Sequence, residues 1–259
     1  MSTGKYIAFV DSDDIVHSRY FEILLNCIKR NNADMVVCDY EKIVEYTQEK
    51  NIADISYSNS IKISDILSNA HYKSHIWGRI YKRELLDGIF FREGVEIGED
   101  TVFNLQVVLN KEDTVINEVK QKLYYYLSRN DSAVKTVGHE KIVAIKDEYL
   151  KLTDQTDSDK AKKIYLNEAL KNCLAHRYLT MFSINRDDKA DRQNMRDCLN
   201  KLREIKHLFG FKEKAYFNAL AKFPILYRAY RIYTDRSMID WERRQRKELK
   251  RIKRGQQNG

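Results

Sequence analysis

Three carboxylates, Asp11, Asp13 and Asp14, follow the apolar run Tyr6-Ile7-Ala8-Phe9-Val10 near the start of the sequence. A short unbroken apolar run is typical of a strand that is buried on both faces of a parallel sheet. Ligands of such sheets bind at the carboxyl ends of the strands, so we expect a phosphorylated ligand near these acids. Carboxylates and diphosphates repel each other, so the pattern favours a divalent cation between them. Mg²⁺ or Mn²⁺, which prefer oxygen ligands, would suit Asp11 and Asp13.

A second pair of acids, Glu99 and Asp100, follows Gly98 and precedes apolar residues at helical spacing. The pattern predicts a helix that begins at this pair and whose inner face carries Val102, Leu105, Val108 and Leu109. A helix N-terminus favours an anion, which would keep Asp100 ionised and able to accept a proton. The alternative is that both acids merely start the helix.

Several aromatic and basic residues are candidates for contact with a substrate. Trp77 offers a flat ring that could support a sugar, or it is a core residue of a strand. Arg79 and Lys82 could neutralise a diphosphate, or they lie on a solvated strand edge.

Several of these segments resemble a known family. Residues 4–14, Gly-Lys-Tyr-Ile-Ala-Phe-Val-Asp-Ser-Asp-Asp, resemble the metal-binding DxD segment of family-2 glycosyltransferases of the GT-A type. Residues 77–83 and the Gly-Glu-Asp start at residue 98 are similar to two further elements of that family. Residues 124–132 resemble its late strand and turn.

The resemblance implies a metal-dependent, inverting glycosyltransferase of bacterial surface polysaccharide or glycan synthesis. The expected donor is a nucleoside-diphosphate sugar, most often a UDP-sugar, and the expected acceptor is a glycan or a lipid-linked hydroxyl compound. The cofactor would be Mn²⁺ or Mg²⁺. The roles carried over are catalytic for Asp100 and Glu99, metal-binding for Asp11 and Asp13, and substrate-binding for Asp14, Trp77, Arg79, Lys82 and Arg129.

The resemblance covers only residues 4–135. In the family, the strands that hold the base and ribose of the nucleotide precede the DxD segment, and we find no motif that matches them. We therefore expect a C-terminal half that works with a separate N-terminal half or as a homo-oligomer. A catalytically inactive remnant that binds a partner is the main alternative, and a phosphatase of the haloacid dehalogenase type is a remote one.

The pattern of elements predicts an α/β fold, namely a truncated GT-A-like (Rossmann-like) mixed sheet followed by a mostly α-helical region. We expect a partial catalytic domain at 1–138, a helical region at 139–240 and a basic tail at 241–259. Within the first part, Ser18 is expected to cap a helix whose inner face carries Phe21, Leu24, Leu25 and Ile28. A single helical turn is expected to close at Gly88, and residues 114–116 and 123–127 are expected to form two strands.

Within the second part, one helix is expected to carry an apolar stripe of Leu166, Leu170, Cys173, Leu174, Tyr178 and Met181. A helix kinked at Pro224 is expected to bury the stripe of Phe217, Leu220, Phe223, Tyr227 and Tyr230.

Charge and cysteine content suggest where the protein works. The chain has a net charge of +8, and residues 241–254 alone hold eight Lys and Arg against two Glu. Such a tail is expected to bind an anionic membrane surface, which would place a cytoplasmic protein at the inner membrane face. No nucleic-acid partner is expected, because no aromatic-studded basic surface accompanies the tail. The four cysteines have no paired spacing and are expected to be buried thiols.

Overall fold

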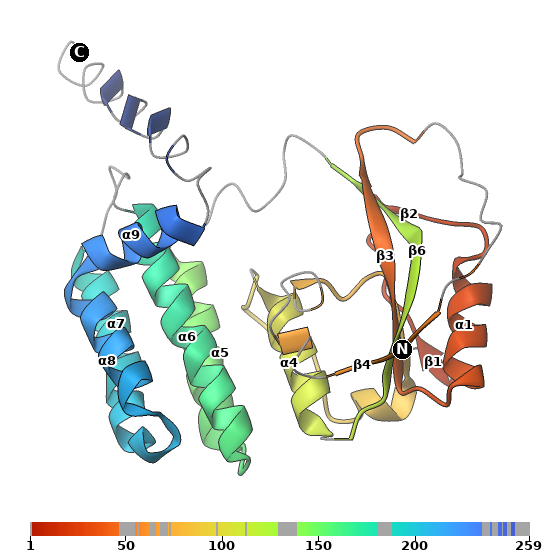
Figure 1. The fold of residues 1–259 in the computed structure, drawn as a ribbon, viewed down its shortest axis with the longest axis horizontal. Helices are drawn as coiled ribbons and strands as arrows, with labels where there is room; N and C mark the ends of the chain where they lie inside the picture. The colour runs from red at the N-terminus through yellow and green to blue at the C-terminus, as the bar shows by residue number, and fades with distance from the viewer. Residues whose placement is uncertain are drawn as a thin grey trace. The chain divides into compact units, whose positions relative to one another are not determined.

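The computed structural model describes residues 2–46, 55, 57–62, 66–67, 72, 74–96, 98–111, 113–128, 139–180 and 188–234, and positions 239, 243–244, 246–247 and 250–251. The chain divides into two compact units, Met1–Thr136 and Val137–Gly259. The first is built on a sheet and the second is helical (Figure 1). Each is described below by itself.

The N-terminal unit contains a mixed, six-stranded sheet with the order β1-β5-β3-β6-β2, in which β4 also pairs with β6. Its strands are β1 (Tyr6–Ile7), β2 (Ile15–Val16), β3 (Met35–Ile43), β4 (Tyr57–Ile61), β5 (Arg79–Lys82) and β6 (Ile116–Leu127). The central pair, β3 and β6, runs parallel, and the other pairs run antiparallel. This sheet confirms the predicted α/β fold with a mixed sheet.

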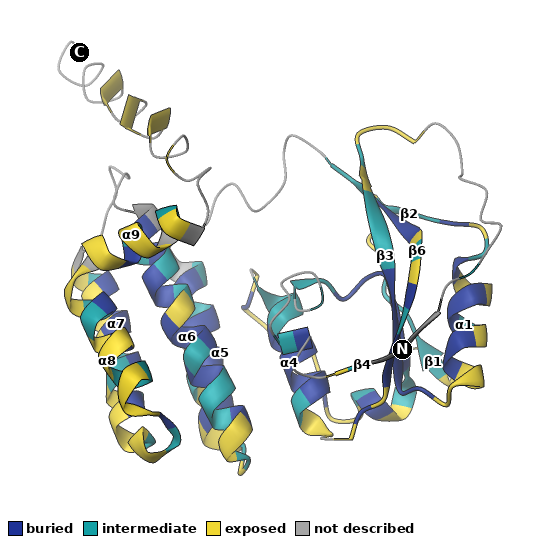
Figure 2. Ribbon diagram, in the orientation of Figure 1, coloured by how far each residue is buried: buried dark blue, intermediate teal, exposed yellow. Residues whose placement is uncertain are grey.

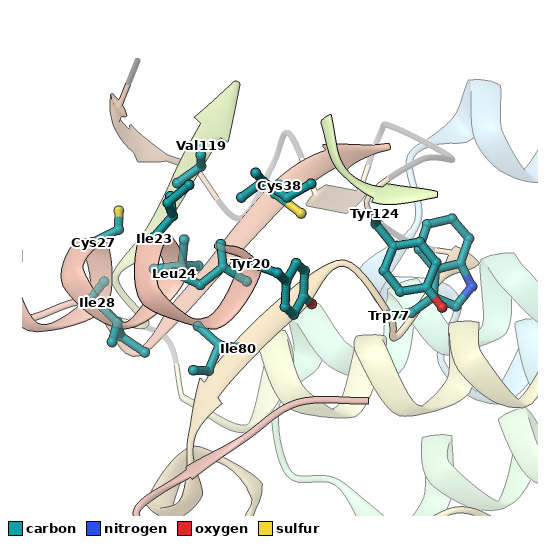
Figure 3. Close-up of a cluster of buried hydrophobic side chains, with 13 residues drawn as sticks. Tyr20, Ile23, Leu24, Cys27, Ile28, Cys38, Trp77, Ile80, Val119 and Tyr124 are labelled. Atoms are coloured by element: carbon teal, nitrogen blue, oxygen red, sulfur yellow. The ribbon is translucent and has the colours of Figure 1, made fainter. Parts of the chain in front are cut away.

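Two helices cover the two faces of this sheet, α1 (Tyr20–Arg30) on one side and α4 (Glu99–Asn110) on the other (Figure 1). Alternation along β3 explains the layers, because successive side chains of a strand point to opposite faces. Val36 and Cys38 pack in the core against α1, whereas Met35 and Val37 pack in the core against α4. Figure 2 shows buried positions along the strands and on both helices, and Figure 3 shows the first of these cores.

The strand expected before the first acids is much shorter than predicted. Strand β1 holds only Tyr6 and Ile7, both partly exposed, and it pairs antiparallel with β5. Phe9 adds one isolated parallel bridge to Trp77, and Val10 is exposed. The prediction of a strand buried on both faces in a parallel sheet was therefore wrong. The apolar run instead forms the short edge strand β1, and Phe9 then lies beside Trp77, just before β5.

Helix α1 exists as predicted, but its buried face is displaced by one position. Phe21 is exposed, and the buried face consists of Tyr20, Ile23, Leu24, Cys27 and Ile28. The expected cap by Ser18 is absent, because the helix begins later; the Arg19 backbone N–H instead donates to His17 Nδ1 at 3.0 Å.

A single turn, η1 (Arg83–Leu86), follows β5, and Gly88 lies beyond it with φ +76°. A single helical turn before Gly88 was predicted there, and the structure confirms it. The apolar segments expected as two strands around residues 114–116 and 123–127 belong to the one long strand β6.

The C-terminal unit is helical. Its helices are α5 (His139–Gln155), α6 (Asp159–Thr180), α7 (Asp188–Glu204), the short turn η3 (Lys206–Leu208), α8 (Phe211–Lys222) and α9 (Pro224–Thr234). Helix α6 contacts α5, α7, α8 and α9, so it forms the centre of the unit. Of its predicted stripe, Leu166, Leu170, Cys173, Leu174 and Tyr178 are buried as expected, and Met181 lies outside the described residues.

Pro224 separates two helices where the sequence predicted one kinked helix. Helix α8 ends at Lys222, and α9 begins at Pro224, a position that suits proline because its missing N–H would have no helical partner there. Phe217, Leu220 and Tyr227 are buried as predicted, whereas Phe223 and Tyr230 are exposed. The expected continuous buried stripe was thus wrong at Phe223 and Tyr230.

Two further findings concern the predicted location of the protein. All four cysteines are free and buried, as expected. Among the residues that the structure describes, no helix combines the length and the apolar character needed to cross a bilayer. Trp241 and most of the predicted tail lie outside the described residues.

Candidate active site

The loop of acids after β1 is held in place by strand β6. The Asp14 backbone N–H donates to the Asp11 carbonyl at 3.1 Å, which closes a turn. Tyr124 accepts a hydrogen bond from the Asp11 backbone N–H at 3.1 Å and donates its hydroxyl to Asp14 Oδ2 at 2.7 Å. The Leu127 backbone N–H donates to Asp14 Oδ1 at 2.8 Å. Both oxygens of Asp14 thus fasten the loop to the sheet.

The second pair of acids lies at the N-terminus of α4, as predicted. Gly98, with φ +76°, turns the chain into the helix, a backbone conformation that an L side chain rarely adopts. Glu99 and Asp100 form the first turn. The Asp100 carboxylate accepts a hydrogen bond from the backbone of Ile76, which ties the helix start to the segment before β5.

Asn104, one helical turn after Asp100, strengthens this connection. Its Nδ2 donates to the His75 carbonyl at 2.8 Å, and its Oδ1 accepts from Arg79 Nη1 at 3.2 Å and from Tyr81 Oη at 3.3 Å. Asn104 is almost completely buried. Because residues i and i+4 share a helix face, Asn104 and Asp100 together hold the segment that carries His75 and Ile76.

A cavity of about 620 Å³ lies between these elements. It is large enough for a small ligand. The acidic residues Asp11, Glu96, Glu99 and Asp100 line it together with Lys42. The remaining lining residues are Tyr40, Ser74, His75, Trp77, Gly98, Thr101 and Tyr126. The structure thus brings Asp11 and the Glu99–Asp100 pair, 88 residues apart in sequence, to one cavity.

Trp77 lies in a stack of aromatic rings. It stacks on Tyr124 with ring centres 4.4 Å apart, visible in Figure 3, and on His75 at 4.2 Å. Two rings cannot both stack this closely on one face, so His75 covers one face of the indole and Tyr124 the other. Only 5% of Trp77 is exposed. A ligand in the cavity would therefore meet the half-buried His75 ring rather than a face of Trp77.

Partial burial and neighbouring negative charges raise the pKa of two acids of the cavity. The pKa of Asp100 is raised to about 6, chiefly because the carboxyl is partly buried and then because Glu99 and Asp11 are negative. Partial burial, followed by the negative charges of Asp14, Asp13 and Glu99, raises the pKa of Asp11. Desolvation thus outweighs the helix dipole that was expected to favour the anion. At neutral pH Asp100 is still mainly ionised, and it is a stronger base than an ordinary aspartate.

Asp11 and Asp13 are suited to a divalent cation in chemical type. Both are carboxylates of the same turn, and the negative charges that help to raise the pKa of Asp11 are what a cation would offset. Among the described residues, no three His, Cys, Asp or Glu side chains form a ready ligand cluster. A cation here would need phosphate or water oxygens to complete its coordination, which is common for Mg²⁺.

The predicted basic contacts are engaged elsewhere. Arg79 is 3% exposed and donates to Asn104 and to the Tyr72 carbonyl, so it supports the wall behind Asp100. Lys82 forms a salt bridge with Asp34 at 3.1 Å. Neither lines the cavity, where Lys42 supplies the cation. Arg129 lies outside the described residues.

Sequence reasoning did not single out His75, Asn104 or Tyr124 for the roles they have here. A signal for Asn104 existed, because a polar side chain four residues after Asp100 shares its helix face. The role of Tyr124 rests on the pairing of Tyr124 with Val16 across β2 and β6, which places it beside the acid loop. That pairing depends on residues more than 100 positions apart.

Comparison with known proteins shows what this arrangement resembles. Residues 1–98 match the family model described as Glycosyl transferase family 2. Poly(ribitol-phosphate) beta-N-acetylglucosaminyltransferase TarP of Staphylococcus aureus is 26% identical over 189 residues, which are 70% of this chain and 54% of TarP. Minor teichoic acid biosynthesis protein GgaB of Bacillus subtilis is 32% identical over 139 residues, 51% of this chain and 15% of GgaB.

The fold is also that of a solved structure. The structure of S. aureus TarS 1-349 in complex with UDP-GlcNAc matches 86% of this chain and 65% of that chain, with a TM-score of 0.59 and 15% identity. Its complex with UDP matches similarly, with a TM-score of 0.55. At this identity the likeness establishes the fold. The chain spans about half the length of TarP. The matches to the family-2 model and to TarP favour a glycosyltransferase over the phosphatase alternative.

Proposed function

Because the N-terminal unit belongs to the family-2 glycosyltransferases of the GT-A type, we propose that this chain transfers a sugar from a nucleoside-diphosphate sugar to an acceptor hydroxyl. The donor is a UDP-sugar, the class bound by the structural neighbour TarS. The acceptor is a hydroxyl of a glycan, polyol phosphate or lipid-linked precursor of a bacterial surface polymer, because the relatives include teichoic acid enzymes.

The observation that carries this proposal is the position of Asp100 in the first turn of α4. Its carboxylate lines the cavity, and its raised pKa of about 6 suits a general base at neutral pH. Asp100 accepts the proton of the acceptor hydroxyl while that oxygen attacks the anomeric carbon from the face opposite the diphosphate. Attack from that face inverts the configuration at the anomeric carbon. Glu99 supports this role, because its negative charge raises the pKa of Asp100.

Asp11 and Asp13 bind the donor side. A divalent cation held there, Mn²⁺ or Mg²⁺, would offset the charge that develops on the departing nucleoside diphosphate. Asp14 does not face the donor in this proposal, because Tyr124 and Leu127 occupy both of its oxygens. Its part is to hold Asp11 and Asp13 in their turn. His75, stacked on Trp77 at the cavity wall, offers its half-buried ring to the acceptor.

The test is turnover of the Asp100→Asn variant. We expect turnover of UDP-sugars to fall by roughly 10²–10⁴-fold, the usual contribution of a general base. Donor affinity should change little, because Asp100 acts on the acceptor proton. The assay measures UDP released in the presence of Mn²⁺ with a panel of UDP-sugars and polyol-phosphate or glycan acceptors. Titration calorimetry measures donor binding.

Asp113→Asn is the matched control, since Asp113 is an exposed acid of the same unit that does not line the cavity. It should keep the turnover of the parent chain. If Asp100→Asn lost donor binding in proportion to turnover, Asp100 would be a structural helix start. If the parent chain bound donor but showed no turnover with any acceptor, the binding-subunit alternative would replace catalysis.

A further inference from the structure

Helix α9 exposes the residues that an amphipathic helix normally buries. Among the side chains of this helix that the structure describes, Tyr227 alone is buried, against the body of the unit. The apolar residues on the outer side are exposed by 59% at Ile225, 44% at Leu226, 46% at Tyr230 and 88% at Tyr233. Phe223, just before the helix, is 57% exposed. We call this set the α9 face.

The spacing of these residues makes the α9 face a continuous stripe. Ile225 and Tyr233 are eight residues apart and Leu226 and Tyr230 are four apart, so all four lie on one side of a helix with 3.6 residues per turn. Isolated exposed apolar residues are normal in soluble proteins, but a contiguous group of this size marks an interaction site.

The charge around the α9 face restricts what can cover it. Residues 206–234 contain six Lys and Arg and a single acid, Glu213. Glu213 accepts hydrogen bonds from Lys163 at 2.8 Å and from the Gly210 backbone N–H at 2.9 Å, so it balances another cation. The apolar stripe therefore lies within a basic segment, which is complementary to an anionic surface.

The same charge argues against other parts of this protein as the cover. Residues 235–259 hold nine Lys and Arg against four acids, so they carry the same sign as the segment around the α9 face. A second copy would likewise bring a basic segment against a basic segment. Like charges at close range oppose such contacts.

We infer that the α9 face is a membrane-docking surface that lies on an anionic lipid leaflet. Helices that lie in the plane of a membrane combine an apolar face with flanking Lys and Arg, as this one does. Tyrosine suits the boundary between headgroups and acyl chains, because its ring is apolar and its hydroxyl stays hydrated. Ile225 and Leu226 would enter the acyl region, and the basic segment would contact the headgroups. The basic tail then adds attraction to a contact that α9 creates.

This inference does not depend on the transferase activity, and it is tested on the full chain with vesicles. The first measurement is co-sedimentation with phosphatidylcholine vesicles that contain or lack phosphatidylglycerol, at low and at high salt. The variant Ile225→Gln/Leu226→Gln/Tyr233→Gln changes three exposed positions to a good helix former, so folding should be preserved. We expect its partitioning onto anionic vesicles to fall by more than about tenfold.

The matched control is Val44→Gln/Phe90→Gln, which removes two exposed apolar side chains of the N-terminal unit, 85% and 67% exposed. It should bind anionic vesicles as the parent chain does. Truncation after Thr234 should weaken binding and increase its salt sensitivity without abolishing it, because the α9 face remains.

A second measurement reports insertion directly. In a Trp241→Phe background, Tyr233→Trp leaves the buried Trp77 as the only other indole, since the chain has two tryptophans. Its emission should shift to the blue on addition of anionic vesicles, whereas Val44→Trp in the same background should not respond.

Three results would overturn the inference. The triple variant could bind anionic vesicles as tightly as the parent chain, in which case the tail alone holds the protein there. The Tyr233→Trp emission could remain unchanged on vesicles that bind the protein. The parent chain could self-associate through the α9 face, with the triple variant monomeric and neither binding vesicles, in which case the occupant is a second copy.

Discussion

The two units of this protein treat buried charge in opposite ways. In the N-terminal unit, Asp11, Glu99 and Asp100 gather around one cavity with the same sign, and partial burial followed by their repulsion raises the pKa of Asp11 and Asp100. In the helical unit, buried charges are matched. Lys146 contacts Asp147 at 2.8 Å and Asp197 at 2.9 Å.

His176 and Asp191 continue the pattern of the helical unit. Their side chains are 4% and 3% exposed, and His176 Nδ1 lies 3.0 Å from Asp191 Oδ1. Such a pair connects α6 to α7 and lines neither the cavity beside Tyr216 nor the cavity beside Arg177. The difference teaches that burial of a charged group is by itself weak evidence for function. An excess of like charges beside a cavity is stronger evidence for function. Their repulsion destabilises the fold unless a bound ligand offsets the charge.

The largest effect on turnover is expected from changes to the acids proposed to bind the donor. Asp13→Asn, or removal of divalent cations by a chelator, should lower turnover by at least about 10³-fold, because the departing diphosphate would lose its neutralising charge. Activity is measured as UDP release with and without added Mn²⁺. Asp113→Asn should leave the response to Mn²⁺ unchanged, and full turnover in excess chelator would contradict the cation proposal.

A smaller effect tests whether the helical unit's charges are structural. Asp191→Ala leaves the buried His176 without this partner, so we expect the unit to lose about 2 kcal/mol of unfolding free energy. Urea unfolding followed by the helical circular dichroism signal measures the loss. Asp147→Ala removes a side chain that is 58% exposed, and Lys146 keeps its contact with Asp197, so the substitution should cost less than about 1 kcal/mol. Equal losses in the two variants would contradict the comparison.

These two predictions rest on features that the sequence revealed to different degrees. Local signals predicted α4 and its acids, because Gly98, the carboxylates and the apolar spacing all lie within one short segment. They also predicted the single turn that Gly88 follows. The stripe of α6 was predictable for the same reason, since helical periodicity is a local property.

Features that depend on distant residues were not predictable in this way. The acid loop is held by Tyr124, and the short, exposed character of β1 follows from its position in the sheet. The apolar pattern of residues 217–230 predicted burial, but periodicity states only that a face is apolar. At Phe223 and Tyr230 that face is exposed instead.

The pH dependence of activity sharpens the comparison further. The pKa of Asp100 is raised to about 6, and a general base acts in its deprotonated form. Turnover should therefore be nearly constant above pH 7 and fall about tenfold for each pH unit below 6. The rate is measured at saturating donor and acceptor, with circular dichroism to show that the fold persists. A flat profile down to pH 5 would mean that Asp100 does not accept the proton.

The smallest expected effect is that of Asp100 on the stability of the N-terminal unit. The folded-state pKa of Asp100 lies above its ordinary value of 3.8, so the folded chain binds more protons than the unfolded chain between about pH 4 and 6. Stability therefore falls as the pH rises through that window. Asp100→Asn removes the penalty while its amide oxygen can still accept the hydrogen bond from Ile76.

We therefore expect Asp100→Asn to raise the unfolding free energy of the N-terminal unit by about 1 kcal/mol at pH 7, with no gain below about pH 4. Trp77, stacked in this unit, reports its unfolding in urea through fluorescence. Asp159→Asn is the matched control, because Asp159 is an exposed acid in the first turn of α6. There the helix dipole favours the carboxylate, so the substitution should lower stability by a few tenths of a kcal/mol, roughly the size of an exposed dipole interaction. A loss of stability in both variants would show that Asp100 is an ordinary helix start and that the charge imbalance of the cavity has no cost.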